Sequence, residues 1–186
     1  MPSDLSLTVG AQILFNLAGS YAPATLNDLE LGTATDVAFD LTSVQSLAAE
    51  QSTKADLTAT WAPEYAVHAA LEFATAPVTG TTCDFYWAPS VQSTAGAGNP
   101  GYCTGATGAY TGTPGTLAEG LAQLMFIGSF VCGADATATI QAAFIGILSP
   151  PTRYGSLVMI NNTADHLHSD AVEQAVSFTP IIPQGS

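Results

Sequence analysis

Residues 65–75 read YAVHAALEFAT, and an apolar side chain occupies every second position of this stretch. One face of an extended chain would carry Val67, Ala69, Leu71 and Phe73, and the other His68, Ala70, Glu72 and Ala74. Successive side chains of a strand point to opposite faces, so this alternation is typical of an antiparallel strand with one covered face. We therefore expect a strand whose apolar set faces a core, with His68 and Glu72 facing outward.

Seven further stretches show the same short alternation, bounded by Gly, Pro, Asn or Ser. They are residues 36–44, 55–61, 83–88, 124–131, 137–148, 155–161 and 172–182. Helix is scarce. Residues 10–17 cluster apolar side chains, and residues 114–124 place Thr116 three positions before Glu119, as a capping box requires. The pattern predicts an all-β fold, an antiparallel β-sandwich that is jelly-roll-like, with one or two short helices.

The first part of the chain alternates less regularly than the rest. We predict an N-terminal arm or outer strand over residues 1–34, which reaches a neighbouring molecule, and a β-sandwich domain over residues 35–186. Residues 93–115, STAGAGNPGYCTGATGAYTGTPG, form a long Gly-rich loop by composition. Two interpretations of this loop stay open: a binding loop that presents its tyrosines, or a flexible loop whose tyrosines pack on their own domain.

Charge limits the partners of this chain. Only two cations, Lys54 and Arg153, stand against fifteen carboxylates, and the net charge is −13. Charged residues make up 9% of the chain, against about 25% in an average soluble domain. Neutralising phosphates requires clusters of Lys and Arg, so we expect no nucleic-acid partner, and anionic lipid would repel the chain. A weakly charged surface favours a subunit that packs against copies of itself or a larger assembly.

Motifs of enzymes and cofactor sites are absent or lack their context. Residues 96–101 match G-x-G-x-x-G, but Pro100 and the residues that follow do not favour the helix that a dinucleotide site needs. Residues 166–170 match H-x-H-x-D, for which we favour an exposed segment after a turn at residues 161–165, with a weak interfacial metal site as the alternative. We predict no enzyme, no catalytic residue, no cofactor and no metal site.

The three cysteines, Cys83, Cys103 and Cys132, match no metal-binding spacing. We expect them to be buried as small apolar side chains, and a bridge from Cys83 to Cys103 is the alternative.

Four residues are candidates for contact with a partner: Tyr102, Tyr110, Arg153 and Trp87. Arg153, the only arginine, either pairs with a carboxylate to fix the last two strands or bridges to a neighbouring subunit. If the chain instead binds carbohydrate, an exposed aromatic surface would be needed, for which the candidates are Trp61, Tyr86, Trp87 and Tyr102; the simpler interpretation places most of these aromatics in the core.

The last third of the chain carries a family resemblance. Its features in order are an apolar strand at residues 144–148, Pro150-Pro151, Arg153-Tyr154-Gly155, a strand ending in Asn161-Asn162, and Phe178-Thr179-Pro180-Ile181. This arrangement resembles small β-sandwich virion proteins of tailed bacteriophages. The resemblance implies a capsid decoration (cement) or tail-associated subunit located in the virion, whose partners are copies of itself and a major capsid or tail protein.

Overall fold

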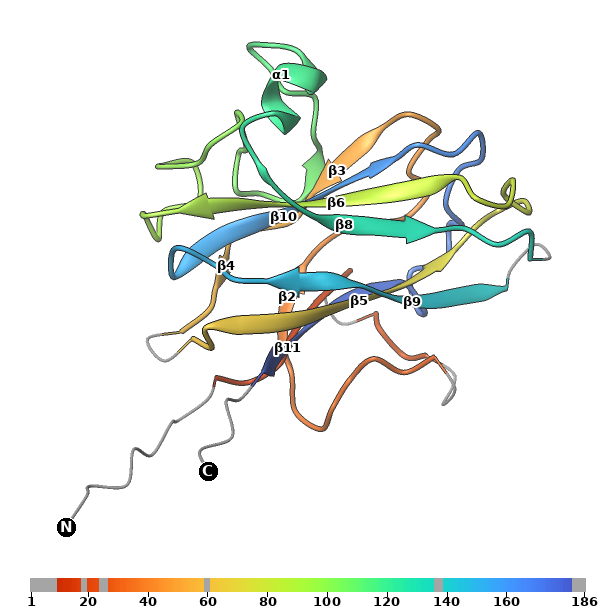
Figure 1. Ribbon diagram of the computed structural model, residues 1–186, viewed down its shortest axis with the longest axis horizontal. Coiled ribbons are helices and arrows are strands. Elements are labelled where there is room, and N and C mark those ends of the chain that lie inside the picture. Colours follow the sequence, from red (N-terminus) through yellow and green to blue (C-terminus); the bar gives the residue numbers. More distant parts are fainter. Residues whose placement is uncertain (1–9, 18–19, 24–26, 59–60, 136–138, 182–186) are drawn as a thin grey trace.

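The computed structural model describes residues 10–17, 20–23, 27–58, 61–135 and 139–181, which form two β-sheets packed face to face (Figure 1). The five-stranded sheet has the order β2 (Thr35–Ala38), β1 (Ile13–Asn16), β11 (Ala175–Ile181), β5 (Glu64–Glu72) and β9 (Ile140–Leu148). The six-stranded sheet has the order β7 (Gly108–Ala109), β3 (Ala49–Gln51), β10 (Tyr154–Asn161), β6 (Thr82–Ser90) and β8 (Met125–Val131), and β4 (Ala55–Asp56) also pairs with β10. The predicted all-β sandwich is confirmed.

Strand pairing follows the pattern of one long hairpin that has been rolled up. Among the eight principal strands, the first pairs with the last (β1 with β11), the second with the seventh (β3 with β10), the third with the sixth (β5 with β9) and the fourth with the fifth (β6 with β8). Pairing of β11 with β5 and of β10 with β6 then joins these hairpins into two sheets. This order is that of a jelly roll. Every pair except β1 with β2 is antiparallel.

The core lies between the two sheets. The apolar set predicted from residues 65–75 is fully covered there, since Val67, Ala69, Leu71 and Phe73 all belong to the main buried cluster. At the centre, the ring of Phe178 lies 4.7 Å from that of Phe15 and 5.5 Å from that of Trp87. Both ring pairs are tilted, at 58° and 56°, and large aromatic side chains packed in this way supply much of the buried apolar area of such a core.

The amino-terminal part differs from expectation. Ile13–Asn16, inside the stretch expected to be helical, is strand β1, and all four of its residues are buried. It lies between β2 and β11, so it is an inner strand of the sheet rather than an arm or an outer strand. Hydrogen bonding to strands on both sides outweighs a short cluster of apolar residues as a determinant of local structure. Residues 1–9 lie outside the described residues.

A short helix, α1 (Leu117–Leu121), confirms the prediction for residues 114–124. The side chain of Thr116 accepts a hydrogen bond from the backbone N–H of Glu119, and the Glu119 carboxylate accepts one from the N–H of Thr116. This is the reciprocal capping box that the sequence indicates.

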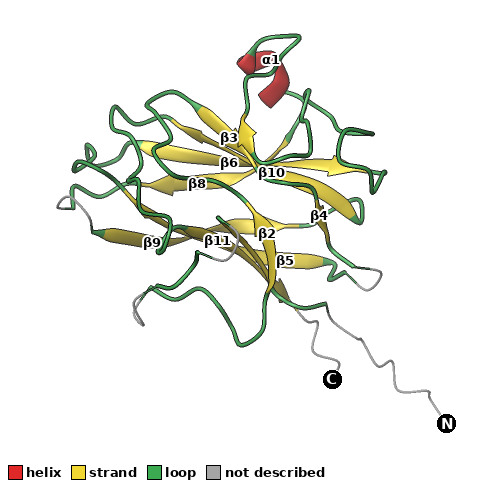
Figure 2. Cartoon of the chain, turned by 180° about the vertical axis from the view of Figure 1, so that it is seen from behind, coloured by secondary structure: helices red, strands yellow, loops and turns green. Residues whose placement is uncertain are grey.

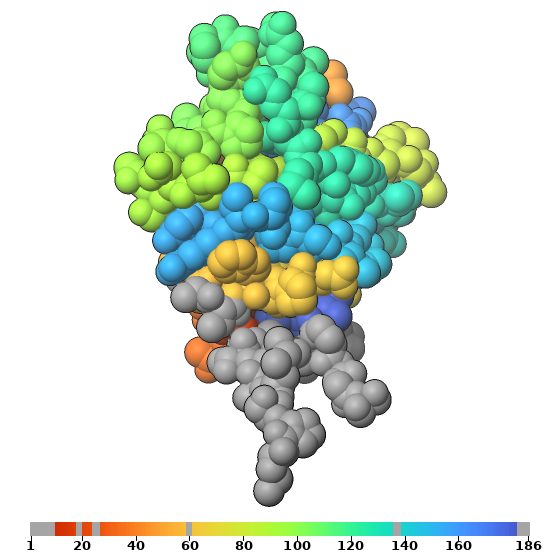
Figure 3. Space-filling view, turned by 60° about the vertical axis from the view of Figure 1, so that its left-hand side comes forward, coloured from red at the N-terminus to blue at the C-terminus, as the bar shows by residue number. Residues whose placement is uncertain are grey.

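Two connecting segments cover the outer faces of the sheets (Figures 1 and 2). Residues 93–124, which include α1, lie on the six-stranded sheet, where Cys103 and Tyr110 pack on Ala49, Ala88 and Val158. Figure 3 shows these residues gathered at one end of the molecule. Residues 27–34 cross the outer face of the five-stranded sheet, where Gln12 holds them by hydrogen bonds to Leu29 and Leu31.

Glu72 lies on the outer face of β5, as expected, but it is 5% exposed. Residues 166–168 pair with the end of that strand, and His168 contacts the Glu72 carboxylate there. Ala70 on the same face is also fully buried. Alternation in the sequence therefore identifies the two faces of β5 correctly, but not which of them is covered.

Candidate functional site

Two of the four predicted contact residues lie inside the protein. Trp87 is fully buried in the core, and Tyr110 is 2% exposed, with its hydroxyl donating a hydrogen bond to the carbonyl oxygen of Gly101. Burial raises the pKa of the Tyr110 hydroxyl, as expected for a phenol removed from water. These positions correct the prediction, because neither side chain is available at the surface for a partner.

Arg153 pairs with a carboxylate, as one of the two interpretations requires. Its Nε and one terminal nitrogen donate to the two oxygens of Asp56 at 2.7 and 2.8 Å. Asp56 lies on β4, so the pair fastens β4 to the start of β10 rather than joining the last two strands. The hydrogen bond to Arg153 lowers the pKa of Asp56. A bridge from Arg153 to a neighbouring subunit stays untested.

Tyr102 is the one predicted aromatic contact that reaches the surface, at 40% exposure. Its backbone has a φ of 63°, and its ring lies so close to Gly115 that a Cβ there would be 2.8 Å from Cε2. Of the other candidate stacking residues, Trp61 is exposed on the connection between β4 and β5, and Tyr86 packs against Phe126 at 5.3 Å between ring centroids. With Trp87 in the core, the four aromatics form no common stacking face.

The Gly-rich loop is fixed by the only lysine. Lys54 Nζ donates to the Ser90 hydroxyl and to the carbonyl oxygens of Gln92, Thr94 and Ala97 at 2.7 to 3.1 Å. Burial lowers the pKa of this ammonium group. Four oxygen acceptors around one ammonium satisfy its three donors, so the start of the loop is held as a closed turn. The loop is therefore part of the packing of the domain, which agrees with the second interpretation for Tyr110.

Two neighbouring strands that the sequence did not indicate as a site each expose large apolar side chains. Phe126 and Val131 on β8 and Phe144 and Ile147 on β9 are exposed, the two phenylalanines to 58% and 55%. β8 and β9 are the outer strands of their sheets on the same side of the sandwich (Figure 1), and neither contains a charged residue. We call these four residues the β8/β9 side. The sequence signal for it was available: both strands are apolar on both faces, without polar alternation.

A hollow of about 240 Å³ adjoins this side on the outer face of the five-stranded sheet, and its lining is mostly apolar. It is lined by Asp28, Leu29, Leu31, Ala66, His68, Ser177 and Thr179. Phe144 packs on the ring of His68 at 5.3 Å, and Ile147 lies directly opposite Ala66 in the strand register. The hollow thus adjoins Phe144 and Ile147, whereas Phe126 and Val131 lie on the outer face of the six-stranded sheet, where they pair with Tyr86 and Thr82.

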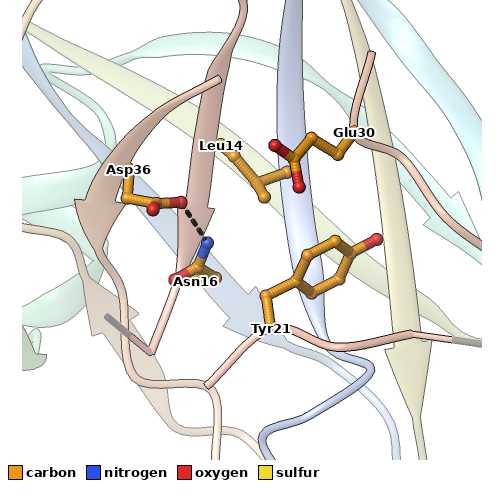
Figure 4. A pocket seen from close by; sticks show the side chains of 5 residues that line it. All are labelled: Leu14, Asn16, Tyr21, Glu30 and Asp36. Atoms are coloured by element: carbon orange, nitrogen blue, oxygen red, sulfur yellow. Dashed lines mark hydrogen bonds between the residues drawn. The ribbon is translucent and has the colours of Figure 1, made fainter. Parts of the chain in front are cut away.

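A second, smaller hollow of about 110 Å³ is polar (Figure 4). It is lined by Leu14, Asn16, Tyr21, Glu30 and Asp36, and Asn16 donates to Asp36 at 2.8 Å. Burial raises the pKa of Tyr21 to about 12, so its hydroxyl stays protonated and binds the backbone of Leu29. Tyr21, which lines this hollow, therefore helps to hold residues 27–29 over the sheet through Asn27 and Leu29.

The histidines do not gather at one place. His166 is exposed, His68 packs on Phe144, and His168 Nδ1 lies 3.4 Å from the Glu72 carboxylate. Burial raises the pKa of Glu72, an effect that His168 partly offsets. No group of three or more His, Cys, Asp or Glu side chains is placed to hold a metal ion in the part of the chain that the structure describes.

All three cysteines are free and buried, as expected. Cys83 belongs to the core between the sheets, whereas Cys103 packs in the cluster outside the six-stranded sheet. The alternative bridge between them is therefore not formed. Cys83 instead has Cys132 as a hydrogen-bonded neighbour, and this contact together with burial raises the pKa of the Cys83 thiol.

Comparison of the chain with protein-family models, with curated proteins and with solved structures yielded no match. Within the described ranges, no helix has the length and hydropathy of a bilayer span.

Proposed function

We propose that this chain is a structural virion subunit, a cement protein that decorates and stabilises a bacteriophage capsid. It attaches to the capsid through its own β8/β9 side, which the contact covers. The observation that carries the proposal is the pair of outer strands, one in each sheet, with exposed Phe126, Val131, Phe144 and Ile147 and no charge. β8 and β9 lie against each other, so the four side chains flank one edge of the sandwich, two on the outer face of each sheet. Exposed apolar side chains that gather in one region are a property of protein interfaces.

The charges of the chain support attachment through this side. The net charge is −13, and both cations are already occupied, Lys54 by the loop and Arg153 by Asp56. Like charges repel wherever acidic surfaces approach one another, and the β8/β9 side avoids that cost because it carries none. Many copies on a lattice can attach stably through modest individual contacts when neighbours also touch.

The experiment is to purify particles from the source and to count this chain by quantitative mass spectrometry against the major shell protein. A copy number comparable to that of the shell protein is expected for decoration, and a far smaller one would move the chain to a vertex or tail tip. Complete absence from particles would refute the proposal. Attachment of the double variant Phe144→Ser, Ile147→Ser should then be weaker than that of Val91→Ser, which removes a similarly exposed apolar side chain elsewhere.

A glycan-binding module on the same fold is the second candidate, because Trp61 and Tyr102 remain exposed. Aromatic faces stack on sugar rings, so either residue alone supplies a contact. A glycan array with the intact chain tests this function: binding that is lost in Trp61→Ala or Tyr102→Ala would favour it over capsid decoration.

A further inference from the structure

We propose that the hollow on the outer face of the five-stranded sheet receives one bulky apolar side chain from a partner segment in which Lys or Arg flank that side chain. The inference rests on the proposed function and deepens it by naming the chemistry of the partner at this point of contact.

The wall of the hollow is built before any partner arrives. Gln12 is 6% exposed, donates to the Leu29 carbonyl at 2.7 Å and to the Thr179 hydroxyl at 3.0 Å, and accepts from the Leu31 N–H at 2.7 Å. The Tyr21 hydroxyl accepts from the Leu29 N–H at 2.8 Å. Residues 29–31 are therefore fixed above β11 and β5. A preformed apolar recess binds with a smaller loss of conformational entropy than a surface that must first become ordered.

The size and lining of the hollow suit one side chain. At about 240 Å³ it falls below the range of roughly 300 to 1,000 Å³ in which drug-sized ligands bind. Leu31, 67% exposed, overhangs it from one side, and Ile147 and Phe144 border it from the other. A central apolar side chain held in such a recess is the usual anchor of a protein interface.

Charge selects the partner. Asp28 lines the hollow, whereas Glu30, two residues later, lines the polar hollow. Glu64 lies on the outer face of β5, two residues from Ala66. A second copy of this chain offers no unengaged cation in its described part, since Lys54 has four oxygen partners and Arg153 has Asp56. An acidic border around an apolar recess is complemented by a cationic segment, which gains both steering and orientation.

The test uses the full chain with labelled Leu, Ile and Ala methyl groups and three synthetic peptides. The probe is acetyl-Gly-Lys-Ser-Phe-Ser-Lys-Gly-amide; one control replaces both Lys with Glu, and the other replaces Phe with Ser. We expect methyl shifts at Leu31, Ala66 and Ile147, with a dissociation constant on the order of 1 mM at low salt for the probe and binding at least roughly tenfold weaker for both controls. Leu31→Ser should abolish these shifts, whereas Val91→Ser should leave them unchanged.

Equal binding of the Glu peptide, shifts confined to other parts of the protein, or no shift at millimolar peptide would overturn the inference. The assay contains no particles, so it separates the two proposals. Absence of the chain from particles refutes capsid decoration even if the probe binds in the hollow. Presence on particles without selective peptide binding refutes only the assignment of this hollow.

Discussion

Gly128 on β8 lies directly against the carbonyl oxygen of Ile145 on β9, so that a Cβ at position 128 would be 2.2 Å from that oxygen. The contact is reciprocal: a Cβ at Gly146 would be 2.7 Å from the carbonyl oxygen of Ile127. Both strands carry a bulge here, because Ile127 and Ile145 are skipped in the pairing registers of their sheets. The bulges bend the two outer strands together, which closes one side of the sandwich and leaves Phe126 and Phe144 directed outward.

This close approach predicts a large effect of one methyl group. Gly128→Ala should destabilise the protein by about 2 to 3 kcal/mol, since the added Cβ meets backbone that can only move with its strand. Gly146→Ala should cost less, because its clearance is larger. The control is Gly96→Ala, where nothing lies within 4 Å and the φ is not positive. Urea unfolding measures all three, and equal stability of Gly128→Ala and Gly96→Ala would contradict the contact.

Lys54 is expected to hold the first part of the Gly-rich loop. Lys54→Met keeps most of the aliphatic stem but removes the ammonium group that joins Ser90, Gln92, Thr94 and Ala97. We expect a loss of about 1 to 2 kcal/mol and faster amide hydrogen exchange in residues 92–98. Arg153→Met is the matched control, because it removes one positive charge away from the loop. Unchanged exchange in Lys54→Met would show that the loop is held by its other contacts.

The stability of the folded protein should depend on pH through Glu50. Burial, with a smaller contribution from Asp40, raises the pKa of Glu50 from 4.5 to about 7, and its Oε2 has no hydrogen-bond partner. A raised pKa means that the folded state binds the proton of Glu50 more tightly than the unfolded state does. The stabilisation that this proton gives the folded state is therefore fully present below about pH 4.5 and is lost as the pH rises through about 7.

Glu50→Gln should therefore gain stability relative to the parent chain between about pH 5 and pH 8, by about 1 kcal/mol once partial exposure is taken into account. Glu64→Gln removes the same charge from an exposed position and controls for net charge. Denaturant unfolding at both pH values provides the measurement. A difference that does not change with pH would rule out titration of Glu50 in this range.

The ion pair between Arg153 and Asp56 should give stability the opposite pH dependence to that from Glu50. Because the pKa of Asp56 is lowered in the folded state, the pair stabilises the protein above the ordinary pKa of Asp, and this contribution is lost as the pH falls through the lowered value. Both side chains are partly exposed, so Arg153→Lys, which loses the two-point geometry, should lower stability only slightly, and less still at high salt. A loss that grows with salt, measured by thermal unfolding, would contradict a surface ion pair.

The sequence by itself determined the long strands, the short helix and the electrostatic character of this protein. Residues 65–75 show which side chains of β5 face the core, and Thr116 with Glu119 marks the start of α1. These features depend on neighbours in the sequence: side chains two residues apart share a face of a strand, and a capping box spans three residues. The scarcity of cations likewise follows from counting alone.

Only the tertiary structure decided which faces are covered. β1 becomes an inner strand because β11, more than 150 residues later, pairs with it. Glu72 is covered where residues 166–168 pair with the end of β5 and His168 contacts its carboxylate, and Tyr110 is covered because its loop packs on β3 and β10. Local periodicity records the two sides of a strand, but the segment that covers a side is selected by packing between distant parts of the chain, which no short window of sequence contains. The hollow at Ala66 exists for the same reason, since Gln12 holds Leu29 and Leu31 above it.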